Sequence, residues 1–181
     1  MSKTKTIPVT FRDRLRLRNV KRWHIINTTR DQTVAEHSYL VWVIAEEIGL
    51  RIGLTQEDFH KLWVLALTHD EHEVFLGDMP TPAKEYLAVD DPREPMSMRF
   101  YMSQDSKLES IVKAADTLEA YWFLRENGVG FRAAQVADEL HERCLTAMAT
   151  VTGNFPACEV PALIELLTES YEGKMPNERQ K

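Results

Sequence analysis

The sequence predicts an all-α protein, a compact bundle of about five to seven helices in a single domain. Apolar residues recur at steps of three and four along most of the 181-residue chain. Capping signals, a hydroxyl or carboxylate followed three residues later by an acid, precede several of these stretches. No stretch shows the strict alternation of a half-buried strand, and there is no internal repeat or low-complexity tract.

The N-terminal segment is expected to hold an arm, a short helix and a loop. Residues 1–8 are polar and predict a flexible arm. Residues 9–18 place Phe11 and Leu15 at helical spacing, which indicates a first short helix. The polar stretch 27–32 contains turn-forming residues and predicts a loop.

The first long helix is predicted to begin at a capping box, with the hydroxyl of Thr33 three residues before the carboxylate of Glu36. Its apolar stripe includes His37, which therefore points toward the core rather than toward solvent. Either Gly49 or Gly53 is expected to end this helix.

The next helix is predicted to follow a second capping signal, which begins at Thr55. Its inward face is apolar at first and then becomes His69, Asp70 and Glu73, and the Gly-Asp-Met-Pro stretch from Gly77 ends it. Ionisable groups at the end of a core-facing stripe need partners, because burying them unpaired costs several kcal/mol.

The second half of the chain predicts further helices. They are, in order, a short helix near 96–104, a long helix capped at Ser106 and ended by Gly128, an amphipathic helix over 131–150 that stops at Gly153-Asn154, and a last helix from Pro161 to about Tyr171 before a polar tail at 173–181.

The composition bears on which partners and which cellular compartment the protein can have. The net charge of −6 disfavours a nucleic-acid partner, and no segment approaches the ~18 apolar residues of a membrane span. Cys144 and Cys158 form no disulfide framework, so we read them as free thiols of a reducing compartment. The N-terminus lacks a secretory apolar region. We therefore expect a cytoplasmic protein.

Four side chains from three predicted helices suggest a divalent-metal site: His37, His69, Asp70 and Asp116. Each also has an ordinary structural explanation. His37 could be a satisfied core histidine, His69 a favourable charge at a helix C-terminus, and Asp116 a solvated helix residue. Metal binding accounts for all four together, because it offsets the cost of burying them.

Five sequence blocks in this order resemble the HD-domain metal-dependent phosphohydrolase superfamily. They are Lys21-Arg22-Trp23, Ala35-Glu36-His37-Ser38, His69-Asp70 with Glu73, Gly77-Asp78-Met79-Pro80-Thr81-Pro82-Ala83-Lys84, and Lys113-Ala114-Ala115-Asp116. They resemble the bacterial 5′-deoxynucleotidase branch and, even more, the phage dATP triphosphohydrolases of the DatZ type. The resemblance covers roughly residues 15–125.

The resemblance implies a role for each matched position. His37, His69, Asp70 and Asp116 would hold one divalent metal, and Glu73 would orient or deprotonate the attacking water with support from Asp78. The substrate would contact Arg22 through its phosphate, Trp23 through its sugar, Ile25 through its base, Pro80 and Thr81 within the fourth block, and Lys84 and Lys113 through its outer phosphates.

These roles compete with plainer ones. Glu73 could be a surface acid, Asp78 a turn residue, and Arg22 part of a solvated basic face. Trp23 and Ile25 could belong to the core. His72 is expected to be a bystander, because Glu73 fits the inward stripe better.

The resulting functional expectation is hydrolysis of a 2′-deoxynucleotide at the α-phosphorus, with dATP giving deoxyadenosine and triphosphate, and dADP and dAMP as further substrates. One alternative is a 5′-deoxynucleotidase that acts on dNMPs, and another is a non-catalytic regulatory module that binds a nucleotide or metal. The resemblance implies one catalytic Zn, Co or Mn ion, a further Mg²⁺ with the triphosphate, and a homo-oligomer (dimer or hexamer). If a phage encodes the chain, its compartment is the host cytoplasm.

Overall fold

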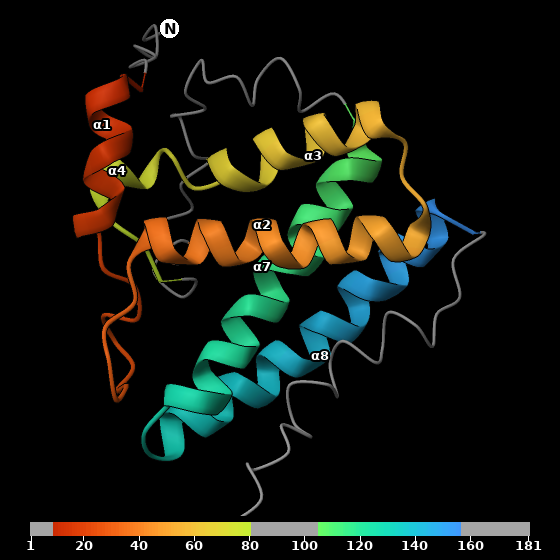
Figure 1. The fold of residues 1–181 in the computed structure, drawn as a ribbon. Helices are drawn as coiled ribbons and strands as arrows, with labels where there is room; N and C mark the ends of the chain where they lie inside the picture. The colour runs from red at the N-terminus through yellow and green to blue at the C-terminus, as the bar shows by residue number, and fades with distance from the viewer. Residues whose placement is uncertain (1–8, 81–104, 157–181) are drawn as a thin grey trace, which may run out of the picture.

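The computed structural model describes residues 9–80 and 105–156, and all the named elements within them are helical (Figure 1). They are α1 (Phe11–Arg16), the 3-10 helix η1 (Leu17–Asn19), α2 (Val34–Ile52), α3 (Gln56–Thr68), α4 (Glu73–Leu76), α7 (Ser106–Asn127) and α8 (Phe131–Asn154). The all-α prediction is confirmed. The predicted arm, the helix near 96–104, the helix from Pro161 and the polar tail lie outside the described residues.

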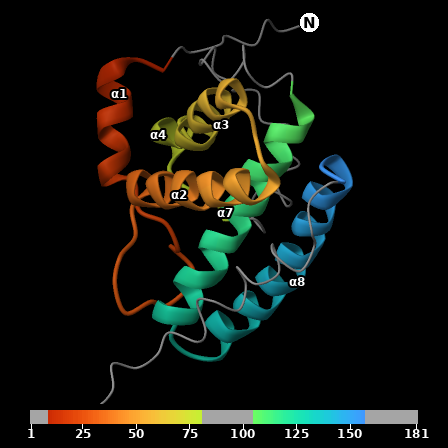
Figure 2. The same cartoon turned by 45° about the vertical axis from the view of Figure 1, so that its right-hand side comes forward.

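The core lies where two antiparallel helix pairs cross. Helices α2 and α3 lie side by side, and α7 passes behind α2 and packs along α8 (Figures 1 and 2). Almost fully buried apolar side chains from all four helices fill the crossing, among them Val41, Ile48, Leu62, Leu65, Ile111, Leu118 and Met148. Each such side chain contributes about 1.5–3 kcal/mol, so α2, α3 and α7 form a rigid support for the polar groups at their edge.

Helix α2 begins and ends as its sequence predicts. The Thr33 hydroxyl accepts a hydrogen bond from the Glu36 amide at the N-terminus. Of the two candidate glycines, Gly53 ends the helix, in the left-handed conformation at φ 71°. Gly49 instead allows close packing of α3, because a Cβ there would lie 2.8 Å from the Phe59 ring.

The predicted helix through Glu73 is wrong in one respect, since α3 stops at Thr68. The amides of Glu71 and Glu73 bond to carbonyls only three residues back, at 3.2 and 3.0 Å, so the chain makes tight turns before α4. His69 Nδ1 also donates to the Ala66 carbonyl (2.8 Å), which caps the helix end. This turn brings His69 and Asp70 together, which an unbroken helix would not do.

Smaller corrections concern other helix ends. The predicted first helix divides into α1 and η1, whereas α8 ends at Asn154, within the predicted Gly153-Asn154 stop. The cap of α7 is Asp105 instead of Ser106, because one Asp105 carboxylate oxygen accepts from the amides of both Lys107 and Leu108. None of the described helices is both long enough and apolar enough to span a bilayer.

Candidate metal centre and adjoining cavity

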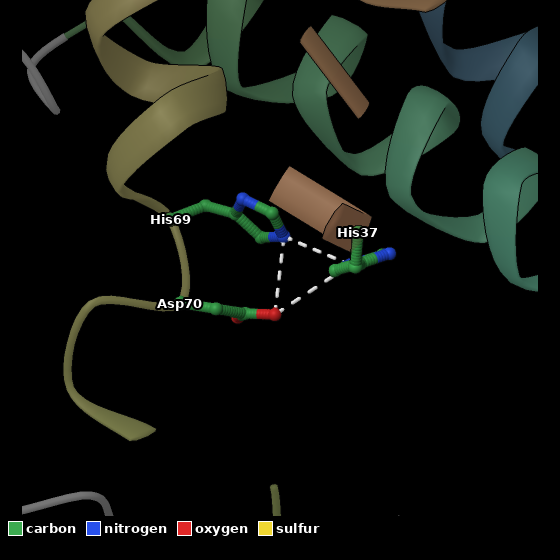
Figure 3. A group of neighbouring side chains, drawn as sticks. All are labelled: His37, His69 and Asp70. Atoms are coloured by element: carbon green, nitrogen blue, oxygen red, sulfur yellow. Dashed lines mark hydrogen bonds and ion pairs between the residues drawn. The ribbon is translucent and has the colours of Figure 1, made fainter. Parts of the chain in front are cut away.

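Three of the four predicted metal ligands form one cluster. His37 comes from α2, and His69 and Asp70 come from the turn that follows α3 (Figure 3). Their donor atoms lie within 4.8 Å of one another. Nε2 of His69 is 3.3 Å from Nε2 of His37 and 3.2 Å from Oδ2 of Asp70. The side chains converge on one point from two separate segments.

The two imidazoles are oriented as metal ligands usually are. His37 Nδ1 donates to the Glu119 carboxylate, and His69 Nδ1 donates to the Ala66 carbonyl. In a neutral ring, a proton on Nδ1 leaves Nε2 with a free lone pair. Two such lone pairs and a carboxylate face one another here, so a cation between them satisfies all three. This donor set fits a divalent transition metal.

Asp116, the fourth predicted ligand, lies at the edge of this cluster. Its Oδ1 is 3.3 Å from His37 Nε2, and its Oδ2 accepts from Lys113 Nζ at 3.1 Å. It comes from α7, one helix turn before Glu119. Asp116 is not a member of the tight group of His37, His69 and Asp70, but it reaches the same imidazole.

The ionisation of these groups follows from their mutual contacts. Burial alone would raise the pKa of Asp70 and Asp116, but the neighbouring imidazoles lower both pKa values overall. Burial and the charge of Arg22 would lower the pKa of His37, whereas its carboxylate partners raise it. The cluster therefore favours ionised carboxylates beside a positive centre, the arrangement that a cation stabilises.

A second group of donors shares Asp70. It consists of Asp70, His72 and Glu73, whose ligand atoms also lie within 4.8 Å of one another. Glu73 is the first residue of α4 and is only 3% exposed. His72, expected to be a bystander, therefore lies beside two acids of the site. Glu73 is a buried carboxylate at the cavity wall rather than a surface acid.

A cavity of about 610 Å³ adjoins the cluster. Its walls come from the segment before α2, the turn after α3, α4 and the residues that follow it, α7 and α8. The lining residues are Arg22, Trp23, His24, Ile25, Ile26, Asp70, Glu73, Asp78, Met79, Pro80, Lys113, Asp116, Thr117, Ala120, Arg132, Val136, Glu139, Leu140 and Arg143. Its size falls within the ~300–1,000 Å³ of small-molecule pockets. Every predicted site residue that the structure describes lines this cavity, except His37 and His69.

Two buried polar side chains, Gln32 and Glu119, hold Arg22 at this wall of the cavity. Its Nη1 donates to Gln32 Oε1 (3.0 Å) and to Glu119 Oε2 (3.1 Å). Burial would lower the pKa of Arg22, but the charge of Glu119 and of three nearby aspartates raises it. Its Nε is buried without a hydrogen-bond partner. Arg22 is thus a fixed cation with a donor to spare, not part of a solvated basic face.

Trp23 adopts a strained backbone beside it. Its φ of 64° is the only positive value at a described residue other than glycine. The indole stacks on Phe123 with ring centroids 5.7 Å apart, and its Nε1 donates to Gln32 Oε1 at 2.8 Å. Strain held by such contacts is typical of functional sites. Ile25 lines the same wall and is 59% exposed, which disfavours a core role.

The remaining predicted residues divide into two sets. Asp78 and Pro80 line the cavity, and Asp78 Oδ2 lies 4.0 Å from Arg22 Nε, so Asp78 faces the arginine as well as the open space. Lys113 lines the cavity from α7. Thr81 and Lys84 lie outside the described residues.

Sequence reasoning missed four polar residues of the site. Glu119 and Gln32 are 3% and 0% exposed and join Arg22 to His37. Arg132 and Arg143 line the cavity from the exposed face of α8. The sequence could have pointed to Glu119, because it stands three residues after Asp116 on the same helix face. The α8 arginines had none, since solvated arginines are common on such faces.

Comparisons of the sequence with known proteins agree with this geometry. The family described as 5′-deoxynucleotidase YfbR-like matches residues 11–89. A dATP triphosphohydrolase of Salmonella phage PMBT28 is 37% identical over 147 residues, covering 75% of this chain and 76% of that protein. A dATP triphosphohydrolase of Cyanophage S-2L is 34% identical over 137 residues, covering 72% of this chain and 78% of that protein.

A solved structure is similar as well. The Cyanophage S-2L HD phosphohydrolase (DatZ), bound to dA and one catalytic Zn²⁺ ion, matches with a TM-score of 0.74 and 27% sequence identity. The match covers 92% of this chain and 96% of that chain. The sequence blocks, the helical architecture and the cluster of His and Asp residues all point to the same family. The chain belongs to the YfbR-like HD-domain phosphohydrolases, the family that includes phage dATP triphosphohydrolases and 5′-deoxynucleotidases.

Proposed function

We propose that this protein hydrolyses dATP at the α-phosphorus to deoxyadenosine and triphosphate, with dADP and dAMP as further substrates. The observation that carries the proposal is one cavity that joins Asp70 and Asp116 of the candidate metal centre to Arg22 and to cations on α7 and α8. A nucleotide needs both features, because the reacting phosphate requires charge neutralisation and the outer phosphates require further cations.

His37, His69, Asp70 and Asp116 would hold the divalent metal, for which Zn, Co and Mn suit this donor set. When bound, the metal polarises a phosphoryl oxygen and lowers the pKa of water. Glu73 lies one turn beyond Asp70 and lines the cavity, where it can accept the proton of the attacking water. Asp78, which lines the same cavity, would support this step or act at the leaving group.

The nucleoside half would lie against the segment before α2. Arg22, a fixed cation at the cavity wall whose Nε has no hydrogen-bond partner, would bind the α-phosphate. Trp23 is fixed by Phe123 and Gln32, so its ring can exclude a 2′-hydroxyl from the sugar position. Ile25 would contact the base, and Pro80 and Thr81 would be further substrate contacts.

The outer phosphates would lie toward α7 and α8. Lys113, Arg132 and Arg143 line this part of the cavity, and Lys84 is a further candidate. Within the described residues, Arg143 has no carboxylate within salt-bridge distance, so its charge is available to a ligand. Lys113 already pairs with Asp116, and Arg132 lies 3.7 Å from Glu139, so Arg143 is the main support for a triphosphate over a monophosphate. A further Mg²⁺ would accompany the triphosphate.

Two other functions make different predictions. A 5′-deoxynucleotidase would use the same metal and Arg22 but would release orthophosphate from dNMPs. A non-catalytic regulatory module would bind a nucleotide without turnover. The buried Glu73 at the cavity wall disfavours the second, because a module without chemistry gains nothing from that cost.

The test is incubation of the purified protein with Co²⁺, Mn²⁺ or Zn²⁺ and each dNTP, dNMP and NTP, followed by chromatographic separation of products. We expect triphosphate and deoxyadenosine from dATP, and little turnover of ATP. Orthophosphate from dNMPs alone would replace the proposal by the 5′-deoxynucleotidase alternative. No turnover of any nucleotide would leave only the regulatory module.

Arg143→Ala separates triphosphate binding from monophosphate binding. We expect the KM for dATP to rise about tenfold, because a charged hydrogen bond to an outer phosphate is lost, while the KM for dAMP stays near the wild-type value. Steady-state kinetics with both substrates measure this. Arg12→Ala, on the exposed α1, is the matched control. An equal rise for both substrates would place Arg143 at the α-phosphate or the nucleoside instead.

We also propose that the chain acts as a cytoplasmic homo-oligomer, a dimer or hexamer. Large apolar side chains exposed at the start of α8 support an interface, since Phe131 is 86% exposed and Val129 just before it is 47% exposed. The biological role would be depletion of the dATP pool.

A further inference from the structure

We propose that Glu119 is a positioning residue that holds the metal ligand His37 and the phosphate-binding Arg22 with a single carboxylate. The inference rests on the proposed function, because it assumes that Arg22 binds the nucleotide phosphate. It adds a link between two parts of the site that lie on different segments, α2 and the loop before it. Loss of this one carboxylate therefore weakens two separate binding events.

The first half of the link is the contact with His37. Glu119 Oε2 accepts from His37 Nδ1 at 2.5 Å, and both side chains are almost fully buried. This bond fixes the tautomer and the ring orientation, so that Nε2 faces His69 and Asp70. Carboxylates that hold a metal-binding histidine in this way typically change metal affinity by about 10–100-fold when removed.

The second half is the contact with Arg22. The same Oε2 accepts from Arg22 Nη1 at 3.1 Å, and that side chain is only 10% exposed. Together with Gln32 the bond fixes the guanidinium at the cavity wall, where its Nε has no hydrogen-bond partner and lies 4.0 Å from Asp78. Without the carboxylate, a buried guanidinium loses its nearest counter-charge and its fixed orientation.

Gln32 completes the network and provides a matched comparison. Its Nε2 donates to Glu119 Oε1 at 2.6 Å, and its Oε1 accepts from Arg22 Nη1 and Trp23 Nε1. It thus supports the substrate side through two residues and has no hydrogen bond to His37 among the described residues. Removing Gln32 should disturb nucleotide binding alone, whereas removing the Glu119 charge should disturb both functions.

The experiment compares Glu119→Gln with Gln32→Met in the full-length, metal-stripped protein. Zinc affinity is measured by competition with a chromophoric chelator, and dAMP binding without metal is measured by calorimetry. We expect Glu119→Gln to weaken zinc binding by about 10–100-fold and dAMP binding by about tenfold. Gln32→Met should weaken dAMP binding and leave zinc affinity at the wild-type value. A thermal melt checks that each variant is folded.

Each outcome decides the inference. Unchanged zinc affinity in Glu119→Gln overturns the first half, and unchanged dAMP affinity overturns the second. If Glu119→Gln does not fold, Glu119→Asp replaces it, because its shorter side chain keeps the charge but withdraws the shared oxygen from both His37 and Arg22. It should show the same two losses, and retention of either affinity overturns the corresponding half. Neither measurement needs turnover, so failure to hydrolyse dATP refutes the proposed function without mimicking these results.

Discussion

Asp116→Ala is expected to abolish metal retention and hydrolysis together. Asp116 Oδ1 lies 3.3 Å from His37 Nε2, and its carboxylate adds negative charge at the ring nitrogen that also faces Asp70. Loss of a metal that stabilises the transition state by several kcal/mol lowers the rate by roughly 10³-fold or more. Metal content by elemental analysis and the rate of dATP turnover measure both effects.

The matched control is Asp138→Ala, an exposed aspartate on α8 that does not line the cavity. It should keep full metal content and activity. Full metal content in Asp116→Ala would show that the proposed ligand set is wrong. Loss of activity with the metal retained would mean that Asp116 contacts the substrate, together with Lys113, rather than the metal.

Glu73→Gln is expected to lower kcat by about 10²–10⁴-fold, the usual contribution of a general base, with metal content unchanged. The amide keeps the shape of the side chain but cannot accept the proton of water. Glu73 is 3% exposed and lines the cavity one residue beyond His72. Single-turnover rates with saturating dATP measure this effect without interference from substrate affinity.

Glu71→Gln serves as the control for Glu73→Gln. Glu71 is equally buried, at 3% exposed, but its carboxylate pairs with Arg14 at 2.7 Å and does not line the cavity. It should lower the melting temperature and leave kcat near the wild-type value. A Glu73→Gln variant that loses its metal would instead make Glu73 a ligand, through the group that it forms with Asp70 and His72.

The spacing of apolar residues in the sequence predicted only part of the site. His37 stood out because it falls on an apolar stripe, and the structure buries it completely. Arg22 and Trp23 were assigned through the family resemblance, and both line the cavity. The end of α3 at Thr68 could not be predicted from the sequence. The helical spacing of the inward-facing residues continues past Thr68, although the backbone there changes to three-residue turns. That break, rather than helical periodicity, decides how His69 and Asp70 meet.

The sequence by itself determined the helical class, the N-terminal caps of α2 and α3 and the candidate metal ligands, because these depend on contacts three or four residues apart or on side-chain chemistry that is scarce in a core. Only the tertiary structure decided that Glu119 holds His37 and Arg22, which lie 82 and 97 residues away in the chain. It also decided that α8 contributes arginines to the cavity. Such contacts depend on how helices cross, and local periodicity carries no information about the partner that a polar side chain meets there.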